Sequence, residues 1–216
     1  MPKSVVQPYT NWKDLEANAV IGKQQFDKAM DNVAKKLGLR TDIKPKELLD
    51  DLVSNDEGFL FKAPLKGYKR ALEKVTDDYE GDWNQVNDIV RGTISVKSLD
   101  DVATAIEAMR SEGIDFVARP KDRFLKPVPG GYRDILGLVK LPNGMNAEIQ
   151  FHVKEMTAAK AIAHKYYEVQ RTIEGRYEIK KPDVSWSKQD LIDHKNSFDS
   201  QVKIYEPAWS RTLNST

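Results

Sequence analysis

Two acidic residues, Asp88 and Glu148, occur in segments that are expected to be strands. The segment DIVRGTISV (88–96) is rich in β-branched residues and predicts a strand that opens with Asp88. Glu148 lies in NAEIQFHV (146–153), where polar and apolar residues alternate, so Glu148 and Gln150 would share one face of a second strand. A carboxylate on a covered sheet face needs a cation or a metal ion as its partner. Mg²⁺ is typically bound by one or two carboxylates and substrate phosphates, so the pair indicates a magnesium site if the strands are neighbours; a solvated strand face is the alternative.

Four cationic residues recur at every fourth position of KAPLKGYKRALEK (62–74), namely Lys62, Lys66, Arg70 and Lys74. Pro64 favours a helix from there to about Thr76, and positions four apart share one face of a helix. Like charges at this spacing repel each other unless an anion offsets the repulsion. The pattern therefore indicates a binding site for a polyphosphate. The alternative is a solvated helix face on which Glu73 and nearby acidic residues pair with the cations.

A basic loop, RPKDRFLKPVPGGYRDI (119–135), separates the two acidic residues in the sequence. Its cations are Arg119, Lys121, Arg123, Lys126 and Arg133. Next to a carboxylate pair, such a loop indicates a nucleotide site in which cations neutralise phosphate oxygens. The turn PGGY presents Tyr132, and its glycines would allow close approach of a nucleotide.

The elements that would position these residues follow from hydrophobic periodicity and turn signals. Helices are predicted over residues 11–37, 45–52, 99–113, 155–173 and 188–196. Further strands are predicted over 115–120 and 135–141, and a PNG turn joins the latter to 146–153. This order predicts an α+β or α/β fold with a mixed sheet of about four or five strands flanked by helices.

Composition excludes several classes of protein. A length of 216 residues suits one domain or a core with helical additions, and a net charge of +1 argues against binding to nucleic acid mainly through bulk charge. The absence of cysteine excludes disulfides, thiolate metal sites and a cysteine nucleophile, and the three histidines lack metal-ligand spacing. No signal peptide and no apolar stretch of about 18 residues is present, so we expect a soluble protein with no membrane partner, acting in the cytoplasm. A toxin domain delivered as part of a larger effector would have the same composition.

Residues from about 60 to 170 resemble the synthetase domain of RelA/SpoT-type alarmone synthetases. Five markers occur in the family's order: the basic helix, DIVRGTI, KDRFLKPVPGGYR, EIQFH and AIAHKYYE. No single marker is specific, but their order is. The resemblance implies an α+β, nucleotidyltransferase-like fold related to DNA polymerase beta, with a mixed sheet of about five strands. It also implies transfer of pyrophosphate from ATP to the 3′-hydroxyl of a purine nucleotide, with Mg²⁺ as cofactor.

The resemblance implies a role for each matching residue. The cations that would bind ATP are Lys62, Lys66, Arg70, Lys74, Lys121 and Arg123. The catalytic group would be Glu148, Asp88 and Arg70, with Asp88 and Glu148 holding Mg²⁺ and Glu148 accepting the proton of the acceptor hydroxyl. The residues that would bind the acceptor are Tyr132, Lys126, Gly131, Gln150 and His164. Tyr132 would stack on the acceptor base, Gln150 would orient a sugar or base, and His164 would have a supporting role.

Several departures from the family pattern lie around the acceptor. Arg91 follows Asp88 by three residues instead of five, Gly130 replaces an asparagine, and Leu136 replaces a histidine. His152 and Val153 stand where the family has arginine and threonine. The acceptor could therefore be GDP or GTP, or ADP or ATP, giving (p)ppGpp or (p)ppApp. The sequence is similar to small, synthesis-only, toxin-like members of the family.

Two alternatives and the roles of the flanks stay open. The same chemistry could pyrophosphorylate the 3′ end of tRNA, or the fold could be a catalytically inactive interaction module. We expect an N-terminal helical region at 1–55, a synthetase core at 56–175, and a C-terminal extension at 176–216 that packs on the core. The flanks could bind a neutralising antitoxin or immunity protein, or join the domain to a larger effector.

Overall fold

The structure, a computed structural model, describes residues 5–41, 57–177 and 185–214 and contains a five-stranded sheet with the order β1-β2-β5-β4-β3. The strands are β1 (Phe59–Lys62), β2 (Arg91–Val96), β3 (Lys121–Asp122), β4 (Ile135–Lys140) and β5 (Asn146–Val153). Strands β2 and β5 are parallel, and the other neighbouring strands are antiparallel. The predicted α+β fold with a mixed sheet is therefore confirmed.

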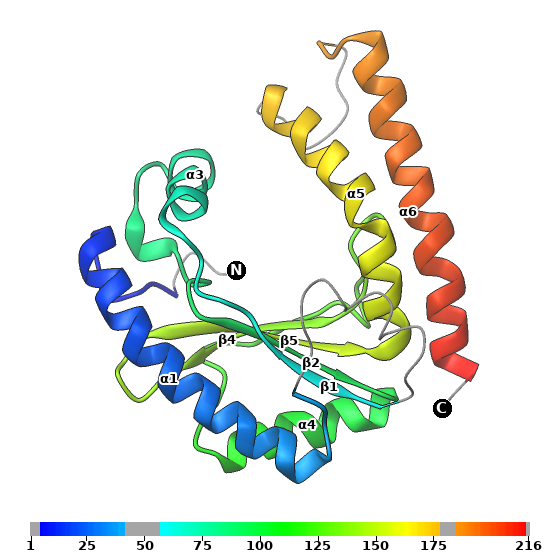
Figure 1. Ribbon diagram of the computed structural model, residues 1–216. Coiled ribbons are helices and arrows are strands. Elements are labelled where there is room, and N and C mark those ends of the chain that lie inside the picture. Colours follow the sequence, from blue (N-terminus) through cyan, green and yellow to red (C-terminus); the bar gives the residue numbers. More distant parts are fainter. Residues whose placement is uncertain (1–4, 42–56, 178–184, 215–216) are drawn as a thin grey trace.

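Helices cover the two faces of the sheet differently (Figure 1). Helices α1 (Trp12–Leu37) and α4 (Leu99–Ser111) lie under one face. Helices α3 (Tyr68–Asp78), α5 (Lys154–Tyr177) and α6 (Lys188–Asn214) lie over the other face, with α5 and α6 packed along each other. A short 3₁₀ helix, η1 (Trp83–Gln85), precedes β2. In the part of the chain that the structure describes, no helix is long and apolar enough to span a membrane.

Strand register separates the core from the polar face. Ile149 of β5 pairs with Gly92 of β2 and Gly137 of β4, and Ile149 is completely buried. A Cβ atom on Gly92 would lie 2.8 Å from the Phe26 ring, so this is the face that α1 covers. Glu148 pairs with Arg91 and Leu138 and therefore faces the opposite side, toward α3 and α5. The predicted alternation along EIQF is confirmed, because the acidic residue and the core residue lie on opposite faces.

Five predicted elements are confirmed by the structure. They are the helices at 11–37, 99–113 and 155–173, and the strands at 135–141 and 146–153. The first helix begins after Asn11, whose side chain accepts a hydrogen bond from the Asp14 N–H, and it ends at Gly38 with a φ of 62°. These local signals are strong because each satisfies backbone groups at a helix end or provides a left-handed conformation.

Three predicted boundaries near the site are wrong. Helix α3 begins at Tyr68, after Gly67, so Lys66 precedes the helix. Strand β2 begins at Arg91, so Asp88 lies in the segment that leads into the strand. The strand expected at 115–120 is a single bridge between Phe116 and Val139, and β3 lies just after it, inside the predicted loop.

Two further differences concern the edges of the fold. The predicted short helix at 188–196 continues to Asn214, although Pro207 lies inside it. Packing of Tyr205 and Ala208, both buried, outweighs the backbone hydrogen bond that a proline removes. Strand β1 was not predicted, because FLFK is only four residues long and forms a strand by pairing with β2. The helix predicted at 45–52 lies outside the described residues.

Candidate active site

Asp88 is held by two lysines on the face of the sheet that α3 covers. Its Oδ2 atom accepts hydrogen bonds from Lys66 Nζ at 2.6 Å and from Lys74 Nζ at 2.7 Å. Lys66 comes from the segment before α3 and Lys74 from within that helix, so the start of α3 brings both over Asp88. Burial alone would raise the pKa of Asp88, but the charges of Lys74 and Lys66 outweigh it and lower this pKa. The carboxylate is therefore ionised at neutral pH.

The two lysines differ electrostatically. Burial lowers the pKa of Lys66, and the attraction of Asp88 offsets this effect only in part. Burial also acts to lower the pKa of Lys74, but there the charge of Asp88 outweighs it and raises the pKa to about 12. The Lys74 ammonium group also lies 5.4 Å from the centroid of the Tyr79 ring. Lys74 is therefore the firmly charged member of the pair.

Glu148 is the second carboxylate of this face. Its Oε1 atom accepts a hydrogen bond from Gln150 Nε2 at 2.9 Å, and its backbone N–H donates to the Val90 carbonyl at 2.9 Å. Burial raises the pKa of Glu148, and the negative charge of Asp88 acts in the same direction. A carboxylate with a raised pKa is suited to accept a proton near neutral pH.

The two carboxylates fit a magnesium ion. Asp88 Oδ1 is buried and has no hydrogen-bond partner, and the charge of Asp88 acts on Glu148. An orphaned buried oxygen of this kind needs a cation or a donor. No cluster of three or more His, Cys, Asp or Glu side chains that could hold a metal occurs among the described residues. Two protein carboxylates, completed by water and substrate phosphates, are a usual arrangement for Mg²⁺.

The structure does not bring Lys62 to this site, contrary to the prediction. Lys62 pairs in register with Gly92, so its side chain lies on the face that α1 covers, and its Nζ is 2.5 Å from Asp31 Oδ1. Lys62 precedes the predicted helix and lies in strand β1, and its role in ATP binding was implied by the resemblance alone. Arg70 lies on α3 at the edge of the site, where its side chain is 61% exposed and pairs with Glu73 at 3.0 Å.

Tyr132 belongs to a buried hydrogen-bond network. Its hydroxyl donates to Asp134 Oδ2 at 2.7 Å and lies 2.9 Å from His152 Nε2. Arg123 donates to both oxygens of Asp134, at 3.0 and 3.3 Å. Burial, together with the nearby Asp134 charge, raises the pKa of Tyr132. Burial and the charge of Lys160 lower the pKa of His152 to about 4, so the imidazole is neutral at pH 7.

This network constrains the roles predicted for the PGGY turn. The centroid of the Tyr132 ring lies 5.6 Å from that of the Tyr205 ring and 5.2 Å from Lys160 Nζ. Gly131 has a φ of 89°, and a Cβ atom there would lie 3.3 Å from Tyr205 Cβ; one on Gly130 would lie 3.0 Å from the Gln201 side chain. The close approach that these glycines permit in the structure is therefore that of α6. Stacking of Tyr132 on a base stays a prediction.

Helix α6 also anchors the basic loop. The Arg133 guanidinium lies 4.3 Å from the centroid of the Trp209 ring and donates to the Phe124 carbonyl at 2.6 Å. The Phe124 ring stacks on Trp209 with centroids 5.9 Å apart. The loop is thus fixed by contacts with the last helix.

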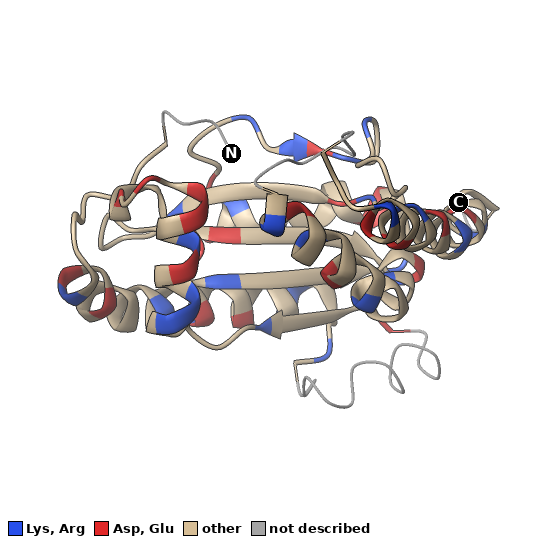
Figure 2. Ribbon diagram, turned by 90° about the horizontal axis from the view of Figure 1, so that it is seen from above, with Lys and Arg blue, Asp and Glu red and all other residues tan. Residues whose placement is uncertain are grey.

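The remaining predicted residues are placed as follows. Lys121 and Lys126 are exposed on the basic loop, while the Arg123 guanidinium is engaged with Asp134. His164 lies on α5 with a side chain that is 63% exposed, 3.6 Å from Glu168. Their contacts with substrates stay predictions. Figure 2 looks onto the face of the sheet between α3 and α5, where charged positions of both signs lie on the central strands.

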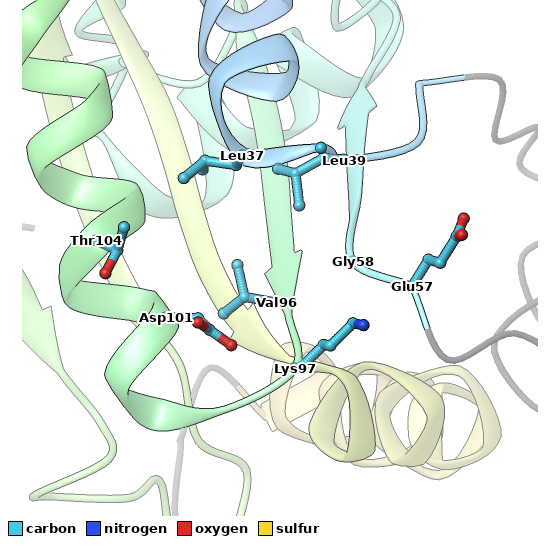
Figure 3. A pocket seen from close by; sticks show the side chains of 9 residues that line it. Leu37, Leu39, Glu57, Gly58, Val96, Lys97, Asp101 and Thr104 are labelled. Carbon is cyan, nitrogen blue, oxygen red and sulfur yellow. The ribbon is translucent and has the colours of Figure 1, made fainter.

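A separate hollow lies where α1 ends and α4 begins (Figure 3). Its volume is about 250 Å³, and Leu37, Leu39, Val96, Asp101 and Thr104 are among the residues that line it. None of the predicted site residues lines this hollow. The carboxylate pair, and not this hollow, is therefore the candidate site.

Comparison with known sequences gives one partial likeness. No family model matches the chain. Over 111 residues, or 51% of its length, the chain is 32% identical to the (p)ppApp synthetase toxin Tas1 of Pseudomonas aeruginosa strain UCBPP-PA14. The matched segment spans 24% of that protein, so the chain covers about a quarter of the length of this curated relative.

Solved structures of small alarmone synthetases superpose on most of this chain. Small alarmone synthetase 2 of Bacillus subtilis superposes with a TM-score of 0.56 at 16% identity, covering 89% of this chain and 93% of the other. Small alarmone synthetase 1 of the same organism, bound to its product pppGpp, gives a TM-score of 0.53 at 16% identity, covering 94% and 98%. The chain has the fold of a small alarmone synthetase. The fold that the resemblance implied is thereby confirmed.

Within this small alarmone synthetase fold, four residues lie around the predicted ones although the sequence predicted no role for them, namely Arg91, Asp134, His152 and Lys160. Arg91 is the register partner of Glu148, a relation that depends on strand pairing. Lys160 is the single charged residue in MTAAKAIA (156–163), a run of otherwise small or apolar residues. That isolated charge is the signal by which Lys160 could have been found.

Proposed function

We propose that the chain is an ATP-dependent pyrophosphokinase that transfers pyrophosphate from ATP to the 3′-hydroxyl of a purine nucleotide. The observation that carries the proposal is the environment of Asp88. One of its oxygens is held by Lys66 and Lys74, and the other is buried without a partner. The second carboxylate, Glu148, lies close enough for the charge of Asp88 to raise its pKa. The likeness to a (p)ppApp synthetase toxin supports the same chemistry.

The mechanism is an in-line displacement in which the acceptor 3′-oxygen bonds to the β-phosphorus. The bond from that phosphorus to the oxygen bridging to the α-phosphorus breaks, and AMP leaves. Asp88 and Glu148 would hold Mg²⁺, which supplies charge neutralisation on the phosphates when bound. Glu148 accepts the hydroxyl proton, because its pKa is raised by burial and by Asp88. Lys66, Lys74 and Arg70 contact the phosphates and offset the repulsion between the two nucleotides.

The acceptor we favour is an adenine nucleotide, ADP or ATP, which gives (p)ppApp. The support is the 32% identity to a toxin that carries this activity in its name. A guanine acceptor, GDP or GTP, is the second possibility within the same proposal, since a neighbour of the same fold binds pppGpp. Depletion of ATP and purine nucleotides would inhibit growth, so we propose that the chain acts as a toxin in the cytoplasm of its target.

Several earlier expectations stay predictions beside this proposal. They are a neutralising immunity protein or antitoxin, delivery within a larger effector, and the division of the chain at 55 and 175. Pyrophosphorylation of the 3′ end of tRNA stays an alternative, and so does an inactive interaction module.

The experiment is a transfer assay with labelled ATP and Mg²⁺, first with ATP alone as donor and acceptor and then with one added acceptor at a time: AMP, ADP, GDP, GTP or tRNA. We expect labelled 3′-pyrophosphorylated nucleotide, with adenine acceptors preferred, and no product when Mg²⁺ is chelated. Label found only in tRNA would replace the nucleotide acceptor with the tRNA alternative. No transfer, together with no ATP binding by calorimetry, would establish the inactive module.

A further inference from the structure

Lys160, in the second turn of α5, is a cation in the site for which none of the predicted roles accounts. Its Nζ atom donates a hydrogen bond to Gln150 Oε1 at 2.8 Å. Within the described part of the chain, no carboxylate forms an ion pair with it. Burial lowers the pKa of Lys160, and the charges of Asp134 and Glu148 oppose this effect. The ammonium group therefore lies close to the catalytic carboxylate but is directed at an amide.

Lys160 determines which way the Gln150 amide faces. An ammonium group can only donate, so the amide atom that faces it must be the oxygen. The NH₂ group of Gln150 then points the other way and donates to Glu148 Oε1 at 2.9 Å. Without Lys160, the amide oxygen loses its charged donor, and only the contacts with Glu148 and His152 remain to hold the amide. Lys160 thus fixes a donor against one oxygen of Glu148 and leaves the other oxygen available to a substrate.

His152 lies beside the same amide and is held by its own partners. Its Nε2 atom is 3.2 Å from Gln150 Oε1 and 2.9 Å from the Tyr132 oxygen. Because the Tyr132 hydroxyl donates to Asp134, its oxygen accepts from the Nε2–H of His152. On the other side, Nδ1 lies 3.3 Å from Thr157 Oγ1. The Nε2–H of His152 therefore faces the same amide oxygen as Lys160, and the charge of Lys160 acts on His152.

We propose that Lys160 is a positioning residue that orients Gln150 and, through it, Glu148 for pyrophosphate transfer. This inference rests on the proposed function. The small residues around Lys160, in TAAKAIA, allow its long side chain to lie along the polar face of the sheet. The role predicted for Gln150, orienting a sugar or base, would then pass to other groups, because both ends of its amide are occupied by protein.

The kinetic test compares Lys160→Met with Lys165→Met, an exposed lysine on the same helix that the mechanism does not use. We expect Lys160→Met to lower kcat by about ten-fold or more while the acceptor KM changes by less than about three-fold, since an orienting group acts on the reacting atoms and not on binding. Lys165→Met should match the wild type, and Lys160→Arg should restore part of kcat. Thermal unfolding identifies any variant that fails to fold, and Lys160→Gln then replaces Lys160→Met.

A double-mutant cycle with Gln150→Leu tests the path of the effect. If Lys160 acts through Gln150, Lys160→Met should have little further effect on kcat in the Gln150→Leu background. An effect as large as in the wild-type background would mean that Lys160 acts on the substrate directly, and the proposal would be wrong.

A second readout does not depend on activity. NMR titration of His152 should give a higher pKa in Lys160→Met than in the wild type, because the Lys160 charge helps to hold that pKa at about 4. The other groups facing His152, Asp134, Arg123 and Tyr132, are unchanged by the substitution. The Gln150 side-chain amide signals should also shift, and Lys165→Met should change neither. If the wild type transfers no pyrophosphate, the proposed function fails while this titration still reports on Lys160. Unchanged His152 and Gln150 signals would overturn the positioning role.

Discussion

At the scale of single residues, the two carboxylates of the site have pKa values shifted in opposite directions. Lys74 and Lys66 lower the pKa of Asp88 against the effect of burial, whereas burial and Asp88 raise the pKa of Glu148. Two nearby groups with separated pKa values can take different roles in one reaction. Here Asp88 is the permanent anion and Glu148 is the group that can accept a proton.

Replacing either carboxylate by its amide should remove transfer but should change stability in opposite directions. We expect Asp88→Asn and Glu148→Gln each to lower kcat by about a hundred-fold to a thousand-fold. Asp88→Asn should lower the free energy of unfolding, because it leaves two partly buried lysines without their anion. Glu148→Gln should leave it equal or higher, because a buried charge and its repulsion with Asp88 disappear.

Chemical denaturation and transfer assays measure these two effects together. Glu107→Gln, on the exposed face of α4, is the control for the loss of one negative charge and should change neither. Wild-type turnover in either site variant would contradict the assignment of the carboxylates.

The buried His152 makes stability depend on pH. Its pKa is about 4 in the folded protein and about 6.5 when unfolded, so the unfolded state binds the extra proton between these values. Stability should therefore be intact above about pH 6.5 and fall by about 3 kcal/mol as the pH drops toward 4. Urea denaturation across this range measures the effect. A flat profile in the wild type would contradict the burial of a neutral His152.

Tyr132 has a hydroxyl and a ring that can be tested separately. Tyr132→Phe should lower the free energy of unfolding by about 1–3 kcal/mol, because the buried Asp134 loses a donor. If the ring stacks on the acceptor base, Tyr132→Ala should also raise the acceptor KM, by the equivalent of about 1–3 kcal/mol, while Tyr132→Phe should not. Equal acceptor KM values in all three proteins would remove the stacking role.

At the scale of elements, α6 holds the basic loop against the sheet. Trp209→Ala removes the surface on which Arg133 and Phe124 pack. We expect it to lower the free energy of unfolding by about 2–4 kcal/mol and to raise the KM for nucleotides, because the loop cations lose their support. Ile192→Ala, at an exposed position of the same helix, should change neither. Unaltered nucleotide binding in Trp209→Ala would show that the loop does not depend on α6.

Elements with strong local signals could be predicted from the sequence, while those fixed by tertiary contacts could not. Helix α1 and the hairpin of β4 and β5 carry caps, periodicity and a turn sequence within their own residues. Strand β1 and the length of α6 depend on pairing and packing with distant segments, which local patterns do not encode.

The same division holds within the site. Asp88 and Glu148 were identified by residue type and strand context, and Lys66 and Lys74 by their spacing. Lys62 lies apart from the site because it belongs to strand β1, where successive side chains alternate between faces and its own side chain falls on the face that α1 covers. Lys160 and His152 acquire their importance from hydrogen bonds across the sheet and α5.

At the scale of the whole molecule, one face of the sheet lies between α3 on one side and α5 with α6 on the other (Figure 1), and charged residues of both signs lie on it (Figure 2). Lys74 approaches Asp88 from α3, Lys66 approaches it from the segment before α3, and Lys160 approaches Gln150 from α5. The net charge of the chain is only +1, so the positive charge that would bind phosphates is a local feature of this face and not of the whole surface. This arrangement suits two nucleotides that meet over the central strands.

The most direct test of the central claim follows both products of ATP in one reaction. ATP labelled on its γ-phosphate is incubated with Mg²⁺ and the preferred acceptor, and AMP and labelled acceptor are counted. We predict one AMP for each acceptor that gains a labelled 3′-pyrophosphate in the wild type, and neither product in Glu148→Gln. Formation of ADP with a singly phosphorylated acceptor, or release of all label as inorganic phosphate, would contradict pyrophosphate transfer.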